Sequence, residues 1–296
     1  MEELYPIAAA SNNTLAELRY CVSLKQQHAG PFSKNNPLGT SKGTASGSTD
    51  ASSDASEAKT SLPFWSTDSR LQFQQVTLEQ LAWQNTIHKL HLAPSFFETA
   101  QGADYHHGWF FQTPIVDCPQ MLQAMIKELT TSTTPTDLDF DTGIYYDSTH
   151  DLYEAAHTLD CDTIVNCTGY GAAALCNDSE LIGGRGILHL YDRKTCQRRR
   201  ETKNAEEAAE DRSVLEDWCI FIDEGPWATP EQPIYMIIRG DKIIIGGTNL
   251  TGDHCPTIRD AERTQLRQNA HLLGIDTAVS KPIAEWVGFR PYRYVS

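Results

Sequence analysis

The sequence predicts an α/β fold with α+β elements, in which a partial parallel sheet is joined by a second, mostly antiparallel sheet. Residues 163–165 (Thr-Ile-Val) form a β-branched run without a polar interruption, which is typical of a strand buried on both faces of a parallel sheet. The β-branched runs 234–238 and 243–245 are separated by 239–242 (Arg-Gly-Asp-Lys), whose composition favours a hairpin turn. The first run therefore predicts a parallel layer, and the later pair predicts an antiparallel one.

Small residues follow the first run, at 166–169 (Asn-Cys-Thr-Gly). Small residues at the carboxyl end of a strand let a ligand approach the backbone, and ligands of open α/β sheets bind outside those ends. Residues 171–175 offer small residues and helix formers, so we expect a helix after the turn. Taken alone, the stretch fits an ordinary buried strand and tight turn equally well.

The composition describes an acidic globular chain with room for one large or two ordinary domains in its 296 residues. Hydrophobic residues make up 40% of the chain, which is normal for a protein with a packed core. The formal net charge of -15 argues against nucleic acid or an anionic membrane surface as the main partner, because both need a basic patch. No apolar run approaches the ~18 residues of a membrane helix, so we expect no membrane partner.

The spacing of cysteine and histidine predicts no metal centre. The eight cysteines include no Cys-x-x-Cys pair, which argues against a zinc ribbon or a thioredoxin-type site. His91, His106 and His107 lack converging carboxylate or cysteine ligands, so we expect surface or structural roles for them. Dispersed cysteines without a secretory signal favour a reduced, intracellular protein.

The N-terminal third predicts helices around a low-complexity insertion. Residues 1–28 carry apolar side chains near helical spacing. Residues 33–61 have almost no large apolar side chain, so we expect this insertion to be disordered. Residues 62–92 carry the broad apolar stripe of a helix, and Thr77 with Gln80 predicts a capping pair within it.

Strands and amphipathic helices alternate through the rest of the chain. Residues 108–117 predict a strand that continues past Pro114, and 119–129 predict a helix whose apolar side faces the core. Residues 194–216 are dense in charge and predict a solvated loop or helix. The other expected elements are strands at 138–146, 183–190 and 218–222, a helix at 258–273 and an extended segment at 283–293.

Three stretches, in this order, resemble the D-amino-acid oxidase family of FAD-dependent oxidoreductases. They are 166–169 (Asn-Cys-Thr-Gly), the strand with Tyr235 that leads to Gly-Gly-Thr at 246–248, and 288–293 (Gly-Phe-Arg-Pro-Tyr-Arg). Arg185 and Gly186 match the family's Arg-Gly-Gln strand, with Ile187 where glutamine is expected. The resemblance covers roughly 105–293 with gaps.

The resemblance implies that the parallel sheet is a partial Rossmann-like FAD-binding sheet and that the antiparallel one is a substrate-domain sheet. Residues 105–130 and 183–286 would then form the substrate-binding domain, and 131–182 with 287–296 would form segments of the FAD-binding domain. Residues 1–32 and 62–104 would be a helical remnant of the FAD-binding domain, separated by the insertion at 33–61.

The resemblance also assigns the site. An amino-acid oxidase has to fix the carboxylate of its substrate, and a planar guanidinium beside a phenol does this. The resemblance implies Arg293 as this guanidinium and Tyr235 as the phenol, both in catalytic and substrate-binding roles. Glu231 stands where mammalian members carry a further tyrosine, and an acid there either alters selectivity or faces solvent. The implied contacts to FAD are Thr168, Gly169, Ile144, Ala29 and Gly30.

Two departures from the family concern the cofactor. No glycine precedes Gly30, whereas the family begins with a strand and a Gly-x-Gly-x-x-Gly turn that holds the pyrophosphate. The family also continues well past its Gly-Phe-Arg-Pro-x-Arg motif, and this chain ends at Ser296. We therefore expect an FAD-dependent D-amino-acid oxidase or a fragment of one, or else a flavin-free relative that binds small acids or a protein partner.

Under the oxidase hypothesis the small-molecule partners are a D-amino acid and O2, and the products are a 2-oxo acid, ammonia and hydrogen peroxide. An NAD-linked dehydrogenase is the weaker third hypothesis, because it needs the same missing glycine turn and explains residues 288–293 less well. The final Tyr-Val-Ser is not the peroxisomal Ser-Lys-Leu address, so cytoplasm and peroxisome both stay open as locations.

Overall fold

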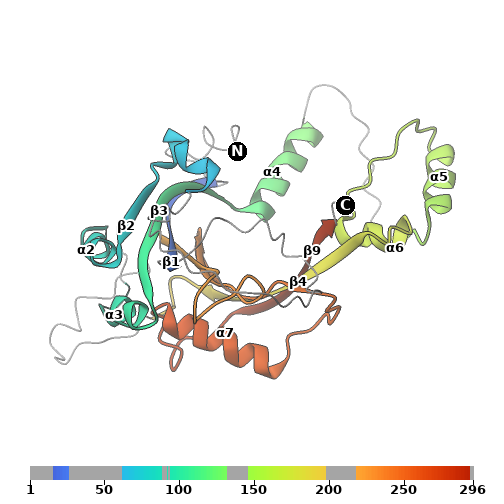
Figure 1. The fold of residues 1–296 in the computed structure, drawn as a ribbon. Coiled ribbons are helices and arrows are strands. Elements are labelled where there is room, and N and C mark those ends of the chain that lie inside the picture. The colour runs from blue at the N-terminus through green and yellow to red at the C-terminus, as the bar shows by residue number, and fades with distance from the viewer. Residues whose placement is uncertain are drawn as a thin grey trace, which may run out of the picture.

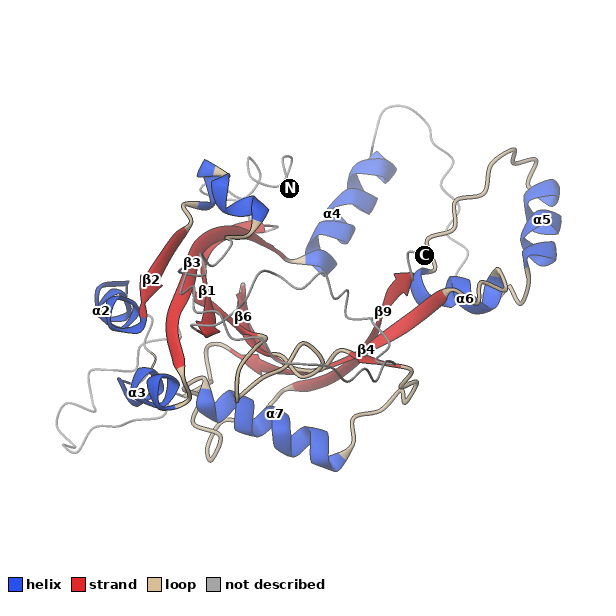
Figure 2. Ribbon diagram, in the orientation of Figure 1, coloured by secondary structure: helices blue, strands red, loops and turns tan. Residues whose placement is uncertain are grey.

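The computed structural model describes residues 16–26, 62–88, 92, 94–131, 146–197 and 218–293. Its centre is one large curved sheet, with helices α2, α3 and α7 along one side and α4 and α5 beyond the other (Figures 1 and 2). The predictions for Ile144, Ala29, Gly30, the insertion at 33–61, the strand at 138–146 and most of 194–216 lie outside the described residues. The described part contains no helix that is long and apolar enough to cross a membrane.

The described strands form a single nine-stranded sheet in the order β2-β3-β1-β5-β6-β7-β4-β8, with β9 also paired to β4. The β1–β5 pair is parallel, and the other described pairs are antiparallel. The predicted mixed α/β class is confirmed, but the expected two sheets are one sheet in the described residues. The strands are β1 (Ala16–Gln26), β2 (Gln74–Thr77), β3 (Tyr105–Val116), β4 (Leu181–Asp192), β5 (Trp218–Ile222), β6 (Ile234–Arg239), β7 (Lys242–Gly246), β8 (Leu250–Thr251) and β9 (Ala284–Arg293).

The helix expected near the N-terminus is wrong over the described residues 16–26, which form strand β1. β1 lies between β3 and β5, and side chains on both of its faces are buried, including Leu24 and Lys25. Burial on both faces hides the two-residue alternation of a strand, so apolar spacing alone cannot identify it. Pairing with distant segments overrides the weak local preference.

The helices on one side of the sheet enclose the main core. The helix expected over 62–92 is wrong for 74–77, which form strand β2, and the helix is confirmed only as α2. α2 begins at the predicted capping pair, because the Thr77 N–H donates to Gln80 Oε1 at 2.8 Å and the Gln80 N–H donates to Thr77 Oγ1 at 3.3 Å. The predicted helix at 258–273 is confirmed as α7, and the strand at 108–117 as β3. The helices are α2 (Leu78–His88), α3 (Pro94–Gly102), α4 (Cys118–Thr131), α5 (Thr149–Thr158), α6 (Ala172–Leu175) and α7 (Asp260–Leu272), with 3-10 turns η1 (Phe64–Thr67), η2 (Ser69–Leu71) and η3 (Gly169–Gly171).

The core lies between that side of the sheet and these helices. Successive residues of a strand point to opposite faces, so every second residue of β5, β6 and β7 faces the core. The buried cluster contains Val22, Leu24, Trp218, Ile220, Met236, Ile238, Ile243 and Ile245 from strands, with Leu78, Leu81, Phe96, Phe97, Ala270 and Leu273 from α2, α3 and around the end of α7. We call this the helix-covered face. The opposite face is called the open face for brevity, although its residues on β1, β6 and β7, among them Tyr235 and Ile244, are buried as well.

Two expectations of burial are wrong. Helix α4 forms as predicted, but its apolar residues Leu122, Met125, Ile126 and Leu129 are exposed. Residues 163–165 form no strand, and the Val165 side chain is 77% exposed. A strand of this kind is buried because it pairs within a sheet whose two faces are both covered by other elements, and among the described residues no strand pairs with this run.

The later predictions agree better with the structure. β6 and β7 form the expected hairpin, with Gly240 in the turn at a φ of +55, where glycine carries no steric penalty. The expected strands at 183–190 and 218–222 are confirmed as β4 and β5, and the extended segment at 283–293 as β9. The expected helix after 166–169 is the single turn α6.

Candidate functional site

Tyr235 lies on the open face of β6 and is almost fully buried, with 7% of its surface exposed. Its ring stacks on Phe221 of β5 at a centroid distance of 5.9 Å. Its partner on β7 is Gly246, and a Cβ atom there would lie 2.0 Å from the ring. Gly246 is therefore the floor on which the phenol lies flat, because no side chain fits between the strand and the ring.

Arg290 lies on the same open face and reaches Tyr235. In β9 it pairs with Gly184 of β4, and its guanidinium lies over Gly186, where a Cβ atom would be 2.5 Å from Nη1. Nη1 donates to the Thr248 carbonyl at 3.1 Å. Burial raises the pKa of Tyr235, and the positive charge of the neighbouring Arg290 guanidinium opposes this shift.

This phenol and guanidinium are suited to bind a carboxylate. A guanidinium presents paired N–H donors that match two carboxylate oxygens, and a neighbouring hydroxyl adds one more donor. Arg290 is exposed as a residue, so solvent and a ligand can reach its side chain. Leu188 and Gly186 of β4 lie on the same face, and Trp286 of β9 borders it with an exposed indole.

Arg293 lies elsewhere. It sits at the end of β9 opposite Leu181, and its guanidinium binds the carboxylates of Asp178 and Glu180. Strand alternation places Arg290 and Arg293 on opposite faces of β9, so the structure brings Tyr235 together with Arg290 and not with Arg293. The motif at 288–293 contains both arginines, and the two-residue period of the strand is the signal that separates them.

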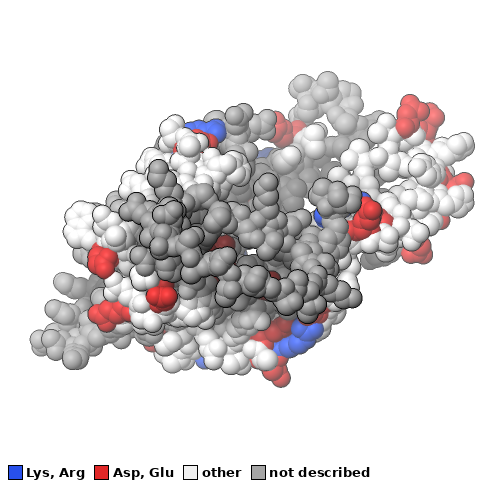
Figure 3. Space-filling model, in the orientation of Figure 1, with Lys and Arg blue, Asp and Glu red and all other residues white. Residues whose placement is uncertain are grey.

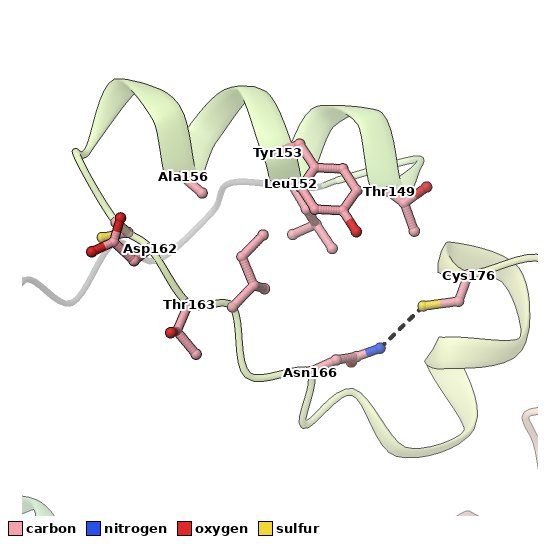
Figure 4. Close-up of a pocket in the computed structure, with 10 residues that line it drawn as sticks. Thr149, Leu152, Tyr153, Ala156, Asp162, Thr163, Asn166 and Cys176 are labelled. Atoms are coloured by element: carbon pink, nitrogen blue, oxygen red, sulfur yellow. Dashed lines mark hydrogen bonds between the residues drawn. The ribbon is translucent and has the colours of Figure 1, made fainter.

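The residues implied as flavin contacts are only partly described. Asn166 Oδ1 accepts hydrogen bonds from the Thr168 N–H at 3.1 Å and the Thr168 hydroxyl at 2.7 Å, and the Asn166 amide donates to Cys176 Sγ (Figure 4). Gly169 has a φ of +57, and no atom lies within 4 Å of its Cβ position. The next residue, Tyr170, stacks on Phe289 at 5.8 Å, on the helix-covered face of β9. This segment therefore approaches the sheet from the side opposite Arg290.

Glu231 does not join the pair. It precedes β6 in an exposed position, and its carbonyl accepts the Asn249 N–H at 2.8 Å. Of the two options left by the sequence, its side chain takes the solvent-facing one.

A buried ion network supports Thr248 from the other face. Arg185 of β4 is fully buried and holds Glu262 of α7 through Nη1 at 2.6 Å and Nη2 at 3.0 Å. Its Nε donates to the Cys255 carbonyl at 2.7 Å, and Nη2 donates to the Thr257 carbonyl at 2.6 Å. The Thr248 hydroxyl donates to the Arg185 carbonyl at 3.1 Å. Thr248 therefore connects the buried Arg185 to the exposed Arg290.

The described residues meet only part of what FAD requires. The pyrophosphate of a dinucleotide is held by backbone N–H groups of a glycine-rich turn between a strand and a helix. No such turn occurs in the described ranges, where the run before Gly169 is not a strand. Gly169 leaves room for a ligand, but the described residues do not by themselves fit FAD, and no catalytic step through it follows from them.

Comparison with known proteins gives similarity at the level of the fold. No protein-family model and no curated protein matches the sequence. A glycine oxidase structure from Bacillus cereus ATCC 14579 matches 99% of this chain at 12% identity and a TM-score of 0.50, over 64% of its own chain. A glycine oxidase structure from Geobacillus kaustophilus matches 45% of this chain at 16% identity and a TM-score of 0.32, over 30% of its own. The chain spans less than two thirds of either glycine oxidase, and the first match agrees with the predicted mixed α/β fold.

Proposed function

We propose that this chain carries the substrate-binding part of an FAD-dependent amino-acid oxidase, acting on D-amino acids as the resemblance to the D-amino-acid oxidase family implies. The observation that carries the proposal is the Tyr235–Arg290 pair on its glycine floor. The glycine-oxidase fold supports the same reaction class, at low identity. The overall reaction would convert a D-amino acid, O2 and water into a 2-oxo acid, ammonia and hydrogen peroxide.

In this proposal Arg290 takes the role of carboxylate-binding guanidinium, with Tyr235 beside it as the phenol. Arg290 belongs to the motif at 288–293 that carries the resemblance. Its Nη1 bond to the Thr248 carbonyl fixes one edge of the guanidinium and orients the other for a bidentate contact. Arg293, which binds Asp178 and Glu180, holds the 178–180 turn against β9.

A second function has its own support. Both members of the carboxylate-binding pair, Tyr235 and Arg290, lie within the described residues, whereas a pyrophosphate-binding turn is not found among them. A flavin-free protein that binds small carboxylic acids is therefore the alternative. Both functions use Arg290, and they differ in the cofactor.

The test combines flavin retention with turnover. The purified chain is incubated with FAD and desalted, its visible spectrum is recorded, and peroxide is assayed with D-alanine, D-aspartate, L-alanine and glycine. The oxidase is supported by a retained flavin band and by D-specific peroxide that Arg290→Gln abolishes and Arg293→Gln leaves. Propionate binding without retained flavin would support the alternative. If propionate also fails to bind to the folded chain, both functions are excluded.

A further inference from the structure

Trp286 is a large apolar side chain that lies exposed on the same face of the sheet as Arg290. The two residues stand an even number of positions apart in strand β9, so their side chains point to the same side. Trp286 is 60% exposed, and its indole lies against Gly288, where a Cβ atom would be 3.1 Å from Cη2. The indole is therefore held in place by the strand and remains available to contact a ligand.

The indole and the guanidinium lean toward each other over a pair of glycines. The Arg290 guanidinium lies over Gly186, and the Trp286 indole lies over Gly288. Gly186 and Gly288 are direct partners in the ladder between β4 and β9. Directly paired residues of antiparallel strands lie about 5 Å apart, and glycines have no side chain to separate the two groups. A carboxylate bound by Arg290 therefore lies beside the indole.

A cross-strand row of apolar side chains continues from the indole toward the phenol. Trp286 pairs with Leu188, Leu188 pairs with Gly246, and Gly246 pairs with Tyr235. Leu188 is half-buried, and the Tyr235 ring lies over Gly246. Residues paired in this way present their side chains on one face, so the surface beside Arg290 is apolar from the indole to the phenol ring.

Tyr292 closes the other side of the guanidinium. It lies on the same face of β9, and its ring crosses the Cβ position of Gly184, the direct partner of Arg290. The Tyr292 hydroxyl donates to Asn249 Oδ1 at 3.0 Å, which fixes the ring in this place. The rest of a ligand held by Arg290 therefore extends toward Trp286.

The charge of the chain makes an apolar contact important for an acid. The formal net charge is -15, and Figure 3 shows the described Lys and Arg side chains in small separate patches on the visible face. Long-range attraction of an anion needs a field of one sign, which this surface does not provide. Arg290 acts at short range, so a larger apolar part on the ligand adds to the affinity.

We propose that Trp286 is a specificity-determining residue that selects carboxylic acids with an aromatic side chain, an inference that rests on the proposed function because it needs Arg290 as the carboxylate-binding group. The ring of the ligand packs against the indole and Leu188 while its carboxylate binds Arg290. A second carboxylate in place of the ring would lie against apolar groups that offer it no cation. The favoured substrate is thus an amino acid with an aromatic side chain, and dicarboxylic acids are disfavoured.

Three probes separate the two ends of the ligand: propionate, 3-phenylpropionate and 3-phenylpropionamide. Their binding to the full chain is measured by ligand-observed NMR, which needs neither flavin nor turnover. We expect 3-phenylpropionate to bind about tenfold more tightly than propionate, because its ring packs on the indole. The amide lacks the carboxylate and should bind about tenfold more weakly than 3-phenylpropionate. Arg290→Gln should weaken both acids.

Variants of Trp286 test the selection through the ratio of the two acid affinities. Trp286→Ala should bring the ratio of 3-phenylpropionate to propionate affinity from about tenfold to near one. Trp286→Phe keeps an aromatic ring and should retain most of the ratio. Trp83→Ala is the matched control, because Trp83 is 66% exposed on α2 and should leave the parent ratio unchanged. Thermal melts confirm that each variant is folded.

The outcomes separate this inference from the proposed function. Equal affinities for the two acids in the parent chain, or a ratio that Trp286→Ala preserves, would overturn the role of Trp286, whereas propionate binding that depends on Arg290 would still support the carboxylate site. Tight binding of 3-phenylpropionate that Arg290→Gln leaves unchanged would also overturn the inference, because the ring would then bind without the carboxylate contact. If neither acid binds to the folded chain, the carboxylate site fails and the inference fails with it.

Discussion

The two faces of β4 give an arginine side chain opposite environments. On the helix-covered face Arg185 is fully buried, and Nε, Nη1 and Nη2 each donate to an acceptor of the protein. On the open face the guanidinium of Arg290 lies over Gly186, beside Tyr235, with one hydrogen bond to a carbonyl, and the residue is exposed. A guanidinium whose three nitrogens all donate to protein acceptors is committed to the fold, and one with most of its donors left over can bind a ligand.

The residues beneath each arginine explain the difference. Ile187 and Leu266 pack around the buried side, which forces Arg185 to find its partners within the protein. Gly184, Gly186 and Gly246 leave the open face flat, so that long side chains from β6 and β9 can lie across it. Predictions that separate the two faces follow, from the largest expected effect to the smallest.

Removing the buried guanidinium should give the largest effect on stability. Arg185→Met takes the bidentate partner from Glu262, which then keeps only Arg259, whose Nη1 donates to Oε1 at 2.9 Å. Because one cation remains, the loss should lie near the lower end of the about 3–5 kcal/mol that breaking a buried pair costs. Urea unfolding followed by circular dichroism measures the loss. The double variant Arg185→Met with Glu262→Leu should recover much of it, because the buried carboxylate is then removed as well and Arg259 keeps Asp253 as its partner. A loss below about 1 kcal/mol for the single variant would show that the pair is not a structural requirement.

Removing the exposed guanidinium should instead affect binding. Arg290→Gln takes away a charge-assisted contact worth about 1.5–3 kcal/mol, or roughly 10–100-fold in affinity, and should leave the unfolding free energy within about 0.5 kcal/mol. Propionate, titrated by ligand-observed NMR, serves as the carboxylate probe. Arg293→Gln is the matched control, since Arg293 lies on the opposite face and binds Asp178. Equal losses in the two variants would contradict the assignment of Arg290.

Filling the glycine floor should disturb both properties moderately. Gly246→Ala places a methyl group 2.0 Å from the Tyr235 ring, and such overpacking costs about 1–3 kcal/mol. The ring has to tilt, so propionate binding should weaken as well. Gly102→Ala is the control, because nothing lies within 4 Å of that Cβ position. In a Tyr235→Ala background the cost of Gly246→Ala should fall, and a cost that persists there would place the strain elsewhere.

The sequence predicts the strands and helices that local signals specify, and it fails for those that depend on distant pairing. The hairpin at Gly240, the helix at 258–273 and the cap at Thr77 depend on local signals, namely turn chemistry, helical period and short-range hydrogen bonds. β1 carries no such signal, because its partners are β3 and β5, far along the chain, and both of its faces are buried. Local spacing therefore suggested a helix where distant pairing makes a strand.

The site shows the same limit. The family resemblance identifies Tyr235 through the motif in its strand. The choice between Arg290 and Arg293 depends instead on which face of β9 each arginine occupies. That parity is set by the register with β4, which no short motif encodes. Nothing in the sequence distinguishes Gly186 and Gly246 from other glycines. Their role is visible only once the Arg290 guanidinium and the Tyr235 ring are seen to lie on them. The exposed Val165 is the reverse case, since its sequence predicts neighbours that the described residues do not supply.

The smallest expected effect is a pH dependence confined to the helix-covered face. His189 is fully buried, and burial lowers its pKa below the ordinary 6.5 although Glu285, in contact with Nε2 at 3.1 Å, opposes the shift. As the pH falls below 6.5, the unfolded chain binds a proton at this position before the folded chain does, so stability decreases by at most about 1.4 kcal/mol per pH unit. Melting temperatures between pH 7.5 and 5.5 should therefore fall less steeply for His189→Gln than for the parent chain. The exposed His150→Gln provides the control and should keep the parent slope. If His189→Gln also keeps that slope, proton uptake on acid unfolding belongs to other groups, and the helix-covered face is held by the Arg185–Glu262 pair without a contribution from this histidine.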